Sequence, residues 1–342
     1  MKNRLVNLRK CLVLVVALLS ICAELGAQTS SRIIEYYGYD DCILLENESV
    51  RVVLCPGAGG RVLEYSLDGE NALYLPPGDE GWIDAPGKAG GSMHAGRFDI
   101  GPELTTPRRP LLWKGQWQGT ITGPFSARLV SQKDDSTGVQ LIRDFRLDRK
   151  GSRLACKQTI KNVSNQTVEY CHWSRTFAIG GGICVIPTSK ISRFPKHYVM
   201  YEEGALINAR PEDEKIRLRD GFLEILAAPR KPKLGFDSRE GWLAYVMPND
   251  LMFVKSFKVD PGRVYNEVAG LTISVWYPDG PMCELEPIGP MERLAPGEAG
   301  SFTETWLLFS QAFPNAGQPL NLSRVRDIVN KNLESPQKGS DP

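Results

Sequence analysis

Two glutamates near the C-terminal end of the chain, Glu284 and Glu286, are separated by one leucine in the stretch MCELEPIG. Alternate residues of a β-strand face the same side, so these carboxylates share one face, while Cys283 and Leu285 share the other. If both carboxylates face a pocket, their repulsion raises one of the two pKa values, which suits acid–base chemistry. If the strand lies at an edge, as Pro287 allows, both are simply exposed.

A histidine that could complement a carboxylate lies in the alternating stretch EYCHWSRTF. His172, Ser174 and Thr176 are expected on one face of this strand, and Trp173 and Arg175 on the other. A histidine and a carboxylate with suitable pKa values can exchange protons with a substrate without a metal. His172 could therefore be a general acid, or a structural histidine on a sheet.

A further group of polar residues falls in HAGRFDIGPE, within a long stretch, 76–119, that is rich in glycine, proline and tryptophan. Its members are His94, Arg97, Asp99 and Glu103. Glycine lets the backbone approach a ligand closely, and arginine forms paired hydrogen bonds. Long loops of compact domains are usually functional, so this stretch is a candidate ligand-lining loop. Alternatively, Arg97 pairs with Asp99 or Glu103 and holds the loop.

The segments that must position these residues are short alternating runs, separated by Gly, Pro, Asp and Asn, from Ile33 to Phe309. They predict one all-β domain, 33–312, made of large antiparallel sheets that face each other. The stretch LSRVRDIVNKNL, 322–333, has a period near 3.6 and predicts a short helix. The polar residues after it complete a C-terminal helix and disordered tail, 313–342.

The first 27 residues read as an export signal. The basic stretch MKNRLVNLRK precedes the apolar CLVLVVALLSICA, and ELGAQ offers cleavage after Ala27. The apolar run is shorter than the roughly 20 residues of a membrane span. We expect a signal peptide, 1–27, and a periplasmic or extracellular protein, with lipid attachment at Cys22 as the alternative. The formal charge of +1 gives no support for a nucleic-acid or anionic-membrane partner.

Six cysteines follow Ala27, at positions 42, 55, 156, 171, 184 and 283. None forms a CxxC pair or a zinc-like cluster with histidine. We expect buried thiols or one or two disulfides, and no metal site.

Three stretches, taken in order, resemble galactose-mutarotase-like proteins. NESVRVVLCPGAGGRVLEYSLDGENALYLPP is similar to their opening strands, and CHWSRTF to the central strand that carries the catalytic histidine in the epimerases. ISVWYPDGPMCELEPIGPMERLAPGEAGSFTETWLLF resembles the C-terminal signature that holds the catalytic glutamate. GRFDIGPE resembles an uncharacterised exported branch, the DUF4380-type proteins. The resemblance implies a β-supersandwich, two large antiparallel sheets with a sugar-binding concave face.

The same resemblance implies aldose-1-epimerase-like chemistry without a cofactor. One group removes the anomeric hydroxyl proton and another protonates the ring oxygen, after which the ring opens and closes again. By position, Glu286, which precedes a proline, would be the base and His172 the acid. The remaining candidates would bind a mono- or oligosaccharide: His94, Arg97, Asp99, Glu103, Arg175, Glu284 and Trp173.

Two observations keep a second function open. The epimerase patterns GR..NR and LHGG are not complete in this chain. The fold also hosts non-catalytic units, so the alternative is a carbohydrate-binding or polysaccharide-processing accessory protein. Trp113, Trp117 and Trp173 could stack on sugar rings in either case, or pack in the core.

Overall fold

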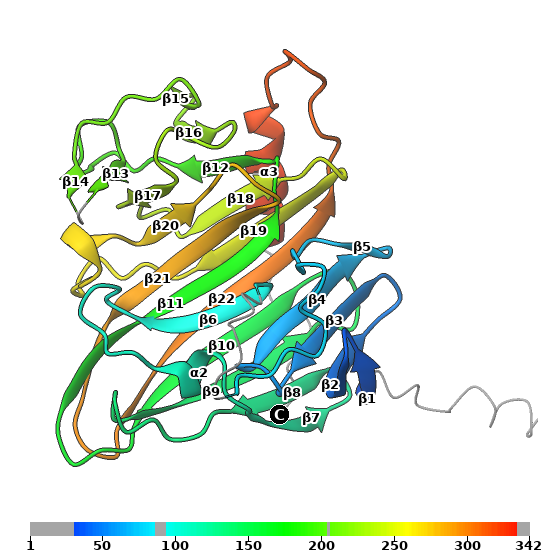
Figure 1. The fold of residues 1–342 in the computed structure, drawn as a ribbon. Helices are drawn as coiled ribbons and strands as arrows, with labels where there is room; N and C mark the ends of the chain where they lie inside the picture. The colour runs from blue at the N-terminus through cyan, green and yellow to red at the C-terminus, as the bar shows by residue number, and fades with distance from the viewer. Residues whose placement is uncertain (1–30, 86–93, 204–205, 334–342) are drawn as a thin grey trace, which may run out of the picture. The chain divides into compact units, whose positions relative to one another are not determined.

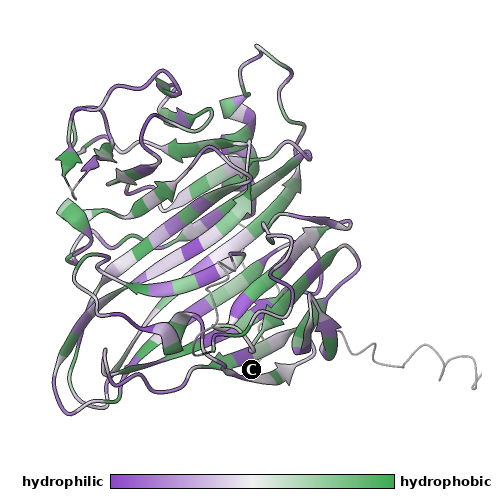
Figure 2. Cartoon of the chain, viewed as in Figure 1, coloured by the Kyte–Doolittle hydropathy of each residue, from purple (hydrophilic) through white to green (hydrophobic). Residues whose placement is uncertain are grey.

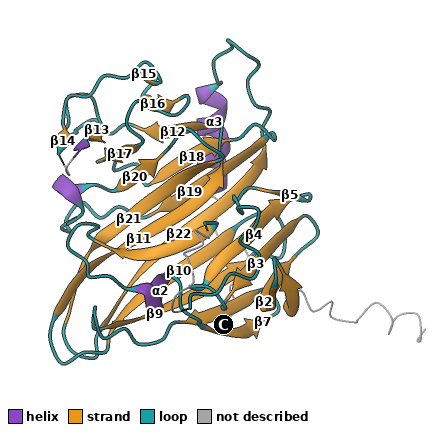
Figure 3. Ribbon diagram, in the orientation of Figure 1, coloured by secondary structure: helices purple, strands orange, loops and turns teal. Residues whose placement is uncertain are grey.

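The computed structural model describes residues 31–85, 94–203 and 206–333 (Figure 1). The predicted signal peptide, with Cys22, lies outside the described residues, as does the end of the predicted tail. Strands dominate the described part of the chain (Figure 3). They form two antiparallel sheets, of twelve and ten strands, as the sequence predicted.

The twelve-stranded sheet carries the candidate site. Its order is β1 (Ser31–Tyr36), β2 (Tyr39–Glu46), β3 (Val50–Cys55), β4 (Arg61–Leu67), β6 (Gly96–Gly101), β11 (Val168–Ile179), β21 (Met282–Leu294), β20 (Ile273–Trp276), β17 (Lys233–Phe236), β13 (Val199–Tyr201) and β14 (Ile207–Asn208), with β5 (Glu70–Asn71) paired to β4. The stretch 76–119 is therefore not one loop, because its segment β6 pairs with β11 in this sheet. All six residues of β6 are buried, which explains why this segment orders as a strand.

The ten-stranded sheet forms the second layer. Its order is β15 (Ile216–Arg219), β16 (Phe222–Ile225), β12 (Ile183–Pro187), β18 (Trp242–Val246), β19 (Leu251–Phe257), β22 (Ala299–Ser310), β10 (Leu154–Asn162), β9 (Val139–Leu147), β8 (Ser126–Val130) and β7 (Gln118–Gly123). Apolar and polar residues alternate along many of these strands, visible as coloured bands in Figure 2.

The main core lies between the two sheets. Phe98 and Leu285 of the first sheet belong to the same buried cluster as Phe253 and Trp306 of the second. The rings of Phe98 and Trp306 stack at 5.5 Å. Alternation along each strand sends one set of side chains into this core and the other set outward, where a site can form.

Two short helices and a 3-10 turn complete the described fold. Helix α3 (Leu322–Leu333) confirms the predicted C-terminal helix. Its Val325 and Val329 pack with Val246 and Val254 on the outer side of the ten-stranded sheet. Helix α2 (Pro110–Trp113) and the 3-10 turn η2 (Val268–Gly270) lie in connecting segments. Within the described ranges, no helix is long and apolar enough to cross a membrane.

All six of the cysteines that follow Ala27 are buried free thiols. The sequence allowed either buried thiols or one or two disulfides, and the structure shows the buried thiols. Cys42 and Cys55 lie on neighbouring strands, β2 and β3, and belong to one buried cluster.

Candidate functional site

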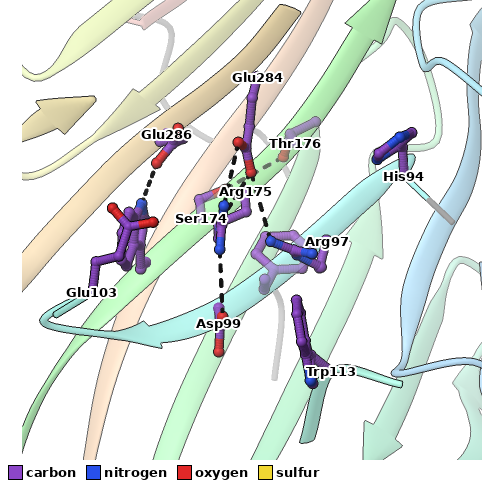
Figure 4. Close-up of polar contacts among 12 residues, drawn as sticks. His94, Arg97, Asp99, Glu103, Trp113, Ser174, Arg175, Thr176, Glu284 and Glu286 are labelled. Atoms are coloured by element: carbon purple, nitrogen blue, oxygen red, sulfur yellow. Dashed lines mark hydrogen bonds and ion pairs between the residues drawn. The ribbon is translucent and has the colours of Figure 1, made fainter. Parts of the chain in front are cut away.

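A pocket of about 560 Å³ opens on the twelve-stranded sheet, on the face turned away from the main core. This volume is typical of sites for small molecules. Among the described residues it is lined by Arg61, Trp82, His94, Arg97, Glu103, Trp113, Lys114, Arg175, Phe177, Lys233, Trp276 and Glu284. Figure 4 shows several of these side chains converging from β6, β11 and β21.

The two central strands of the sheet supply the floor of the pocket. Arg175 and Phe177 come from β11, and Glu284 comes from β21, directly opposite Phe177. Cys283 and Leu285 point to the other side and belong to the main core. The predicted division of this strand into two faces is therefore what the structure shows.

Glu284 is a buried carboxylate fixed by arginine. Its Oε1 accepts a hydrogen bond of 2.8 Å from Nε of Arg175 and lies 3.8 Å from a terminal nitrogen of Arg97. Burial alone would raise its pKa, but Arg175, Arg97 and Lys233 together lower the pKa of Glu284 to about 2. Glu284 is thus a carboxylate at neutral pH.

Glu286 is fully buried and does not line the pocket. Its Oε2 accepts a 2.5 Å hydrogen bond from the indole nitrogen of Trp173, and both of its oxygens lie 2.8 Å from the ammonium group of Lys233. Burial, followed by the charge of Glu284, raises the pKa of Glu286 to about 7. Lys233, which lines the pocket, and the buried Trp173 therefore hold this carboxylate, and of the two neighbouring glutamates Glu284 is the one that a ligand could touch.

His172 faces the opposite side of the sheet. It is 1% exposed, and its ring stacks on Phe302 of the second sheet at 5.8 Å. Burial lowers the pKa of His172 to about 3. Its neighbours Ser174 and Thr176 also point inward, where both contact Lys255. The structure does not bring His172 and Glu286 to one pocket, because adjacent positions along β11 alternate between the two faces.

His94 is the histidine that lines the pocket. Its ring lies 4.5 Å from that of Phe177, centroid to centroid. Burial, together with the charges of Arg61 and Arg97, lowers the pKa of His94 to about 4, whereas Glu284 acts in the opposite direction. His94 is therefore neutral at pH 7.

Asp99 and Glu103, both expected to bind a ligand, lie in different environments: Glu103 lines the pocket and Asp99 does not. Asp99 is buried and binds Arg109 through both oxygens, at 2.7 and 2.8 Å, so its ion pair is with Arg109 rather than Arg97. It also lies 3.9 Å from Arg175 and helps to position that side chain. Glu103 does line the pocket, with an oxygen 3.9 Å from the ammonium group of Lys233.

The three candidate tryptophans have different environments. Trp113 lines the pocket. Trp117 belongs to the main core, and its ring lies 4.1 Å from the guanidinium carbon of Arg143. Trp173 is fully buried, below Lys233 and Arg175. Core packing thus accounts for two of the three.

Six of the described pocket residues were not proposed from the sequence, namely Arg61, Trp82, Lys114, Phe177, Lys233 and Trp276. Arg61 is the most informative, because its guanidinium donates to the carbonyls of Ala58, His94 and Trp113. It therefore ties the turn before β4 to the two segments that carry His94 and Trp113. In the sequence, the place of Arg61 directly after two glycines in PGAGGR is the feature that could have indicated this role.

Gly59 lets this turn approach the segment of Trp113. It has a φ of +68°, and a Cβ at this position would lie 2.1 Å from the carbonyl oxygen of Trp113. The amide of Gly59 also donates to the carbonyl of Gly115 at 2.8 Å. A side chain at this position would push Trp113 away from the pocket.

No metal ligand set is evident in the described ranges, where no group of three or more His, Cys, Asp and Glu side chains could hold an ion. The chemistry available in the pocket is that of guanidinium and ammonium groups, one buried and one half-buried carboxylate, one neutral imidazole and several aromatic faces.

Solved structures share this architecture. A galactose mutarotase-like protein from Clostridium acetobutylicum has a TM-score of 0.55 at 12% identity, over 82% of this chain and 98% of that one. A candidate aldose 1-epimerase from Escherichia coli K12 has a TM-score of 0.54 at 13% identity, over 78% and 98%. A galactose mutarotase-like protein from Lactobacillus casei has a TM-score of 0.53 at 11% identity, over 78% of this chain and 100% of that one.

At sequence identities this low, the structural similarity establishes the fold and nothing further. The chain has the galactose mutarotase-like β-sandwich that its sequence resembled. No model of a known protein family matches the sequence, and no curated protein sequence matches it.

Proposed function

We propose that this protein binds a carbohydrate in the pocket of the twelve-stranded sheet. The observation that carries the proposal is the composition of the pocket wall. The aromatic rings of Trp113, Phe177 and Trp276 can cover the apolar faces of a sugar ring, and fixed charged groups such as Arg175 and Glu284 can bond its hydroxyls. The mutarotase-like names of structures with the same fold favour the same class of ligand.

Calorimetric titration with a panel of aldoses tests this proposal. We expect a Trp276→Ala variant to bind the best sugar at least about tenfold more weakly, because a lost aromatic contact is worth roughly 1 kcal/mol beyond its buried area. Phe125→Ala is the matched control, since Phe125 is half-buried and does not line the pocket. A folded protein that binds no sugar of the panel would refute the proposal for those sugars.

A second candidate, aldose 1-epimerisation, rests on a specific observation. His94 and Glu284 line the same pocket, and the charge of Glu284 acts on the pKa of His94. In this scheme the Glu284 carboxylate takes the anomeric hydroxyl proton, and protonated His94 gives a proton to the ring oxygen. The roles reverse when the ring closes. This pair replaces His172 and Glu286 as the acid and base of the proposal.

The pKa of His94 gives this candidate a characteristic pH dependence. Its acid form is scarce at pH 7 because its pKa is about 4, so the rate above the spontaneous reaction should rise from pH 7 to pH 5. Exchange between the α and β anomers, followed by NMR, measures that rate. Glu284→Gln and His94→Ala should abolish it, whereas His172→Leu should retain it. Sugar binding without acceleration would leave the binding function and remove the epimerase.

We also propose that the mature protein is exported and belongs to the DUF4380-type branch. The export proposal is supported by the basic, then apolar, N-terminal 27 residues, and the branch by GRFDIGPE. Mass spectrometry of the protein expressed with its own N-terminus tests the first. A mature chain that begins at Gln28 is expected. A chain that begins at a lipid-modified Cys22 would indicate anchoring, and an uncut chain would contradict export.

A further inference from the structure

The pocket wall carries more cations than carboxylates. Among the described residues, five cationic side chains line it, Arg61, Arg97, Lys114, Arg175 and Lys233, against two carboxylates, Glu103 and Glu284. Binding a neutral sugar does not require such an excess of positive charge. A cleft lined by one sign of charge with apolar walls attracts ligands of the opposite sign.

Two of these cations are balanced by carboxylates. Arg175 donates to Glu284 at 2.8 Å, and Lys233 contacts both oxygens of Glu286 at 2.8 Å. A third, Arg61, bonds three backbone carbonyls. The ion pairs in this part of the molecule therefore balance the cations of β11 and β17, and the excess positive charge lies on β6 and directly after α2.

Arg97 and Lys114 make up that excess. The carboxylate oxygen nearest to Arg97 in the described part of the chain is that of Glu284, at 3.8 Å, and Arg175 already bonds that oxygen. No carboxylate of the described residues lies within 4.0 Å of the Lys114 ammonium group. Arg97 is only 7% exposed, and burial lowers its pKa to about 9. A buried cation that shares its one nearby carboxylate with another arginine is only partly compensated, and an anion would relieve the cost of its burial.

Trp113 stands between the two cations. Its ring lies 4.7 Å from the guanidinium carbon of Arg97 and 5.4 Å from the ammonium nitrogen of Lys114. Three N–H donors in this part of the pocket wall have no acceptor among the described residues: Nε of Arg97 and the indole nitrogens of Trp82 and Trp113. Buried donors normally have partners, so these three N–H groups add unpaired donors, and no acceptor, to the cationic part of the pocket wall.

We propose that the pocket selects an acidic sugar, one that carries a carboxylate or a phosphate, with the anionic group held between Arg97 and Lys114 beside Trp113. This inference rests on the proposed carbohydrate binding and names its ligand class. A guanidinium fork binds either anion through two hydrogen bonds, and the ammonium group adds a point charge. The aromatic faces of Trp276 and Phe177 remain available for the ring.

Titration with three ligands that share one ring tests the selection: D-glucose, D-glucuronate and D-glucose 6-phosphate. We expect at least one acidic sugar to bind at least about tenfold more tightly than glucose at low salt, and to lose much of this advantage at 1 M salt. The acidic sugar that binds more tightly identifies the anionic group.

In the Arg97→Gln and Lys114→Gln variants, the acidic sugar should bind less than about threefold more tightly than glucose. Glucose itself should still bind to both variants. Lys114 is half-buried, so its variant remains informative if Arg97→Gln does not fold. Arg108→Gln is the matched control, because this exposed cation lies in the same segment but does not line the pocket. The Arg108→Gln variant should favour the acidic sugar over glucose as strongly as the wild type does.

Two results would overturn the inference. One leaves the proposed carbohydrate binding intact, and the other bears on that proposal as well. Equal affinity for all three ligands, or a preference that survives in both pocket variants, would leave carbohydrate binding in place and reject the acidic sugar. No binding of any of them by a folded protein would reject the inference for this ring and, if the aldose panel also fails, the proposed function with it.

Discussion

At the scale of single residues, Glu284 is the carboxylate whose chemistry depends most on its neighbours. It is buried under Arg175 and Arg97, and its pKa lies at about 2 instead of 4.5. A carboxylate whose folded pKa is lowered contributes stability that is fully present above its ordinary pKa. That contribution is lost as the pH falls through the folded value.

Glu284→Gln should therefore lower the free energy of unfolding at pH 7 by about 3 kcal/mol, because it removes the carboxylate that Arg175 bonds directly. The difference between the variant and the wild type should shrink as the pH falls from 4.5 towards 2. Urea unfolding at a series of pH values measures it. Glu169→Gln, at an exposed ion pair with Arg293, should cost less than about 1 kcal/mol. A pH-independent difference for Glu284→Gln would contradict this assignment.

His172 offers the opposite test at the same scale. Its folded pKa, about 3, lies below its ordinary value of 6.5, so the folded state resists its protonation. Wild-type stability should fall as the pH drops from 6.5 towards 3. His172→Leu should remove roughly 3 kcal/mol of this loss at pH 4, with sugar binding unchanged at pH 7. Weakened binding in a stable His172→Leu protein would return His172 to the site.

The site could be predicted from the sequence only in part, and the reason lies in side-chain direction. Alternation correctly placed Glu284 with Glu286 on one face of their strand, and His172 on the opposite face from Arg175. It did not reveal that Arg175, and not His172, shares the pocket with Glu284. It could not tell which of two carboxylates on the same face is covered. Lys233 and Trp173, which cover Glu286, come from distant parts of the chain.

At the scale of elements, the turn between β3 and β4 fixes the segment that carries Trp113 and Lys114. Gly59→Ala should cost at least about 3 kcal/mol and weaken sugar binding, because its Cβ would meet the Trp113 carbonyl at 2.1 Å. Gly69→Ala separates this clash from backbone strain, since Gly69 also has a positive φ, +90°, but has open space. It should cost about 1–2 kcal/mol and leave binding intact.

Equal costs for the two alanine variants would show that the close approach to Trp113 does not matter. Thermal and urea unfolding give the costs, and calorimetry gives the affinity. Loss of binding by the Gly59 variant, with little loss of stability, would still place the turn in control of the pocket.

At the scale of the whole described domain, a buried lysine, ion-paired within the ten-stranded sheet, links the two sheets behind the site. Lys255 of β19 lies 3.2 Å from Glu304 of β22. Its ammonium group also donates to Ser174, Thr176 and the carbonyl of Leu285 on the first sheet, at 2.6, 2.9 and 3.0 Å. The strands that carry Arg175 and Glu284 are therefore anchored from below.

Lys255→Met should lower the free energy of unfolding by about 3–5 kcal/mol, because it leaves the charge of Glu304 buried and unpaired. The double variant with Glu304→Gln should recover at least about 2 kcal/mol, since it leaves no buried unpaired charge. The amide oxygen can still accept a hydrogen bond from one of the two present donors, Gln158 or Trp306. Urea unfolding measures both variants. A double variant no more stable than Lys255→Met would show that the pair is not the source of the loss.

The fold was more predictable than the site. Alternating runs and the resemblance of the first and last strands were enough for two antiparallel sheets, and the period of 322–333 was enough for α3. The strand β6 was missed inside a glycine-rich stretch. Its pairing with β11 depends on partners at least seventy residues away, from Cys171–Gly101 to Thr176–Gly96, which local pattern does not reveal.

The structure of the protein with a bound acidic sugar tests the central claim most directly. Crystals grown with glucuronate or glucose 6-phosphate should show the ring against the aromatic wall of the pocket. Oxygens of the anionic group should lie about 2.7–3.2 Å from nitrogens of Arg97 and Lys114. A sugar bound at another surface, or an empty pocket at a concentration that saturates binding in solution, would contradict the account.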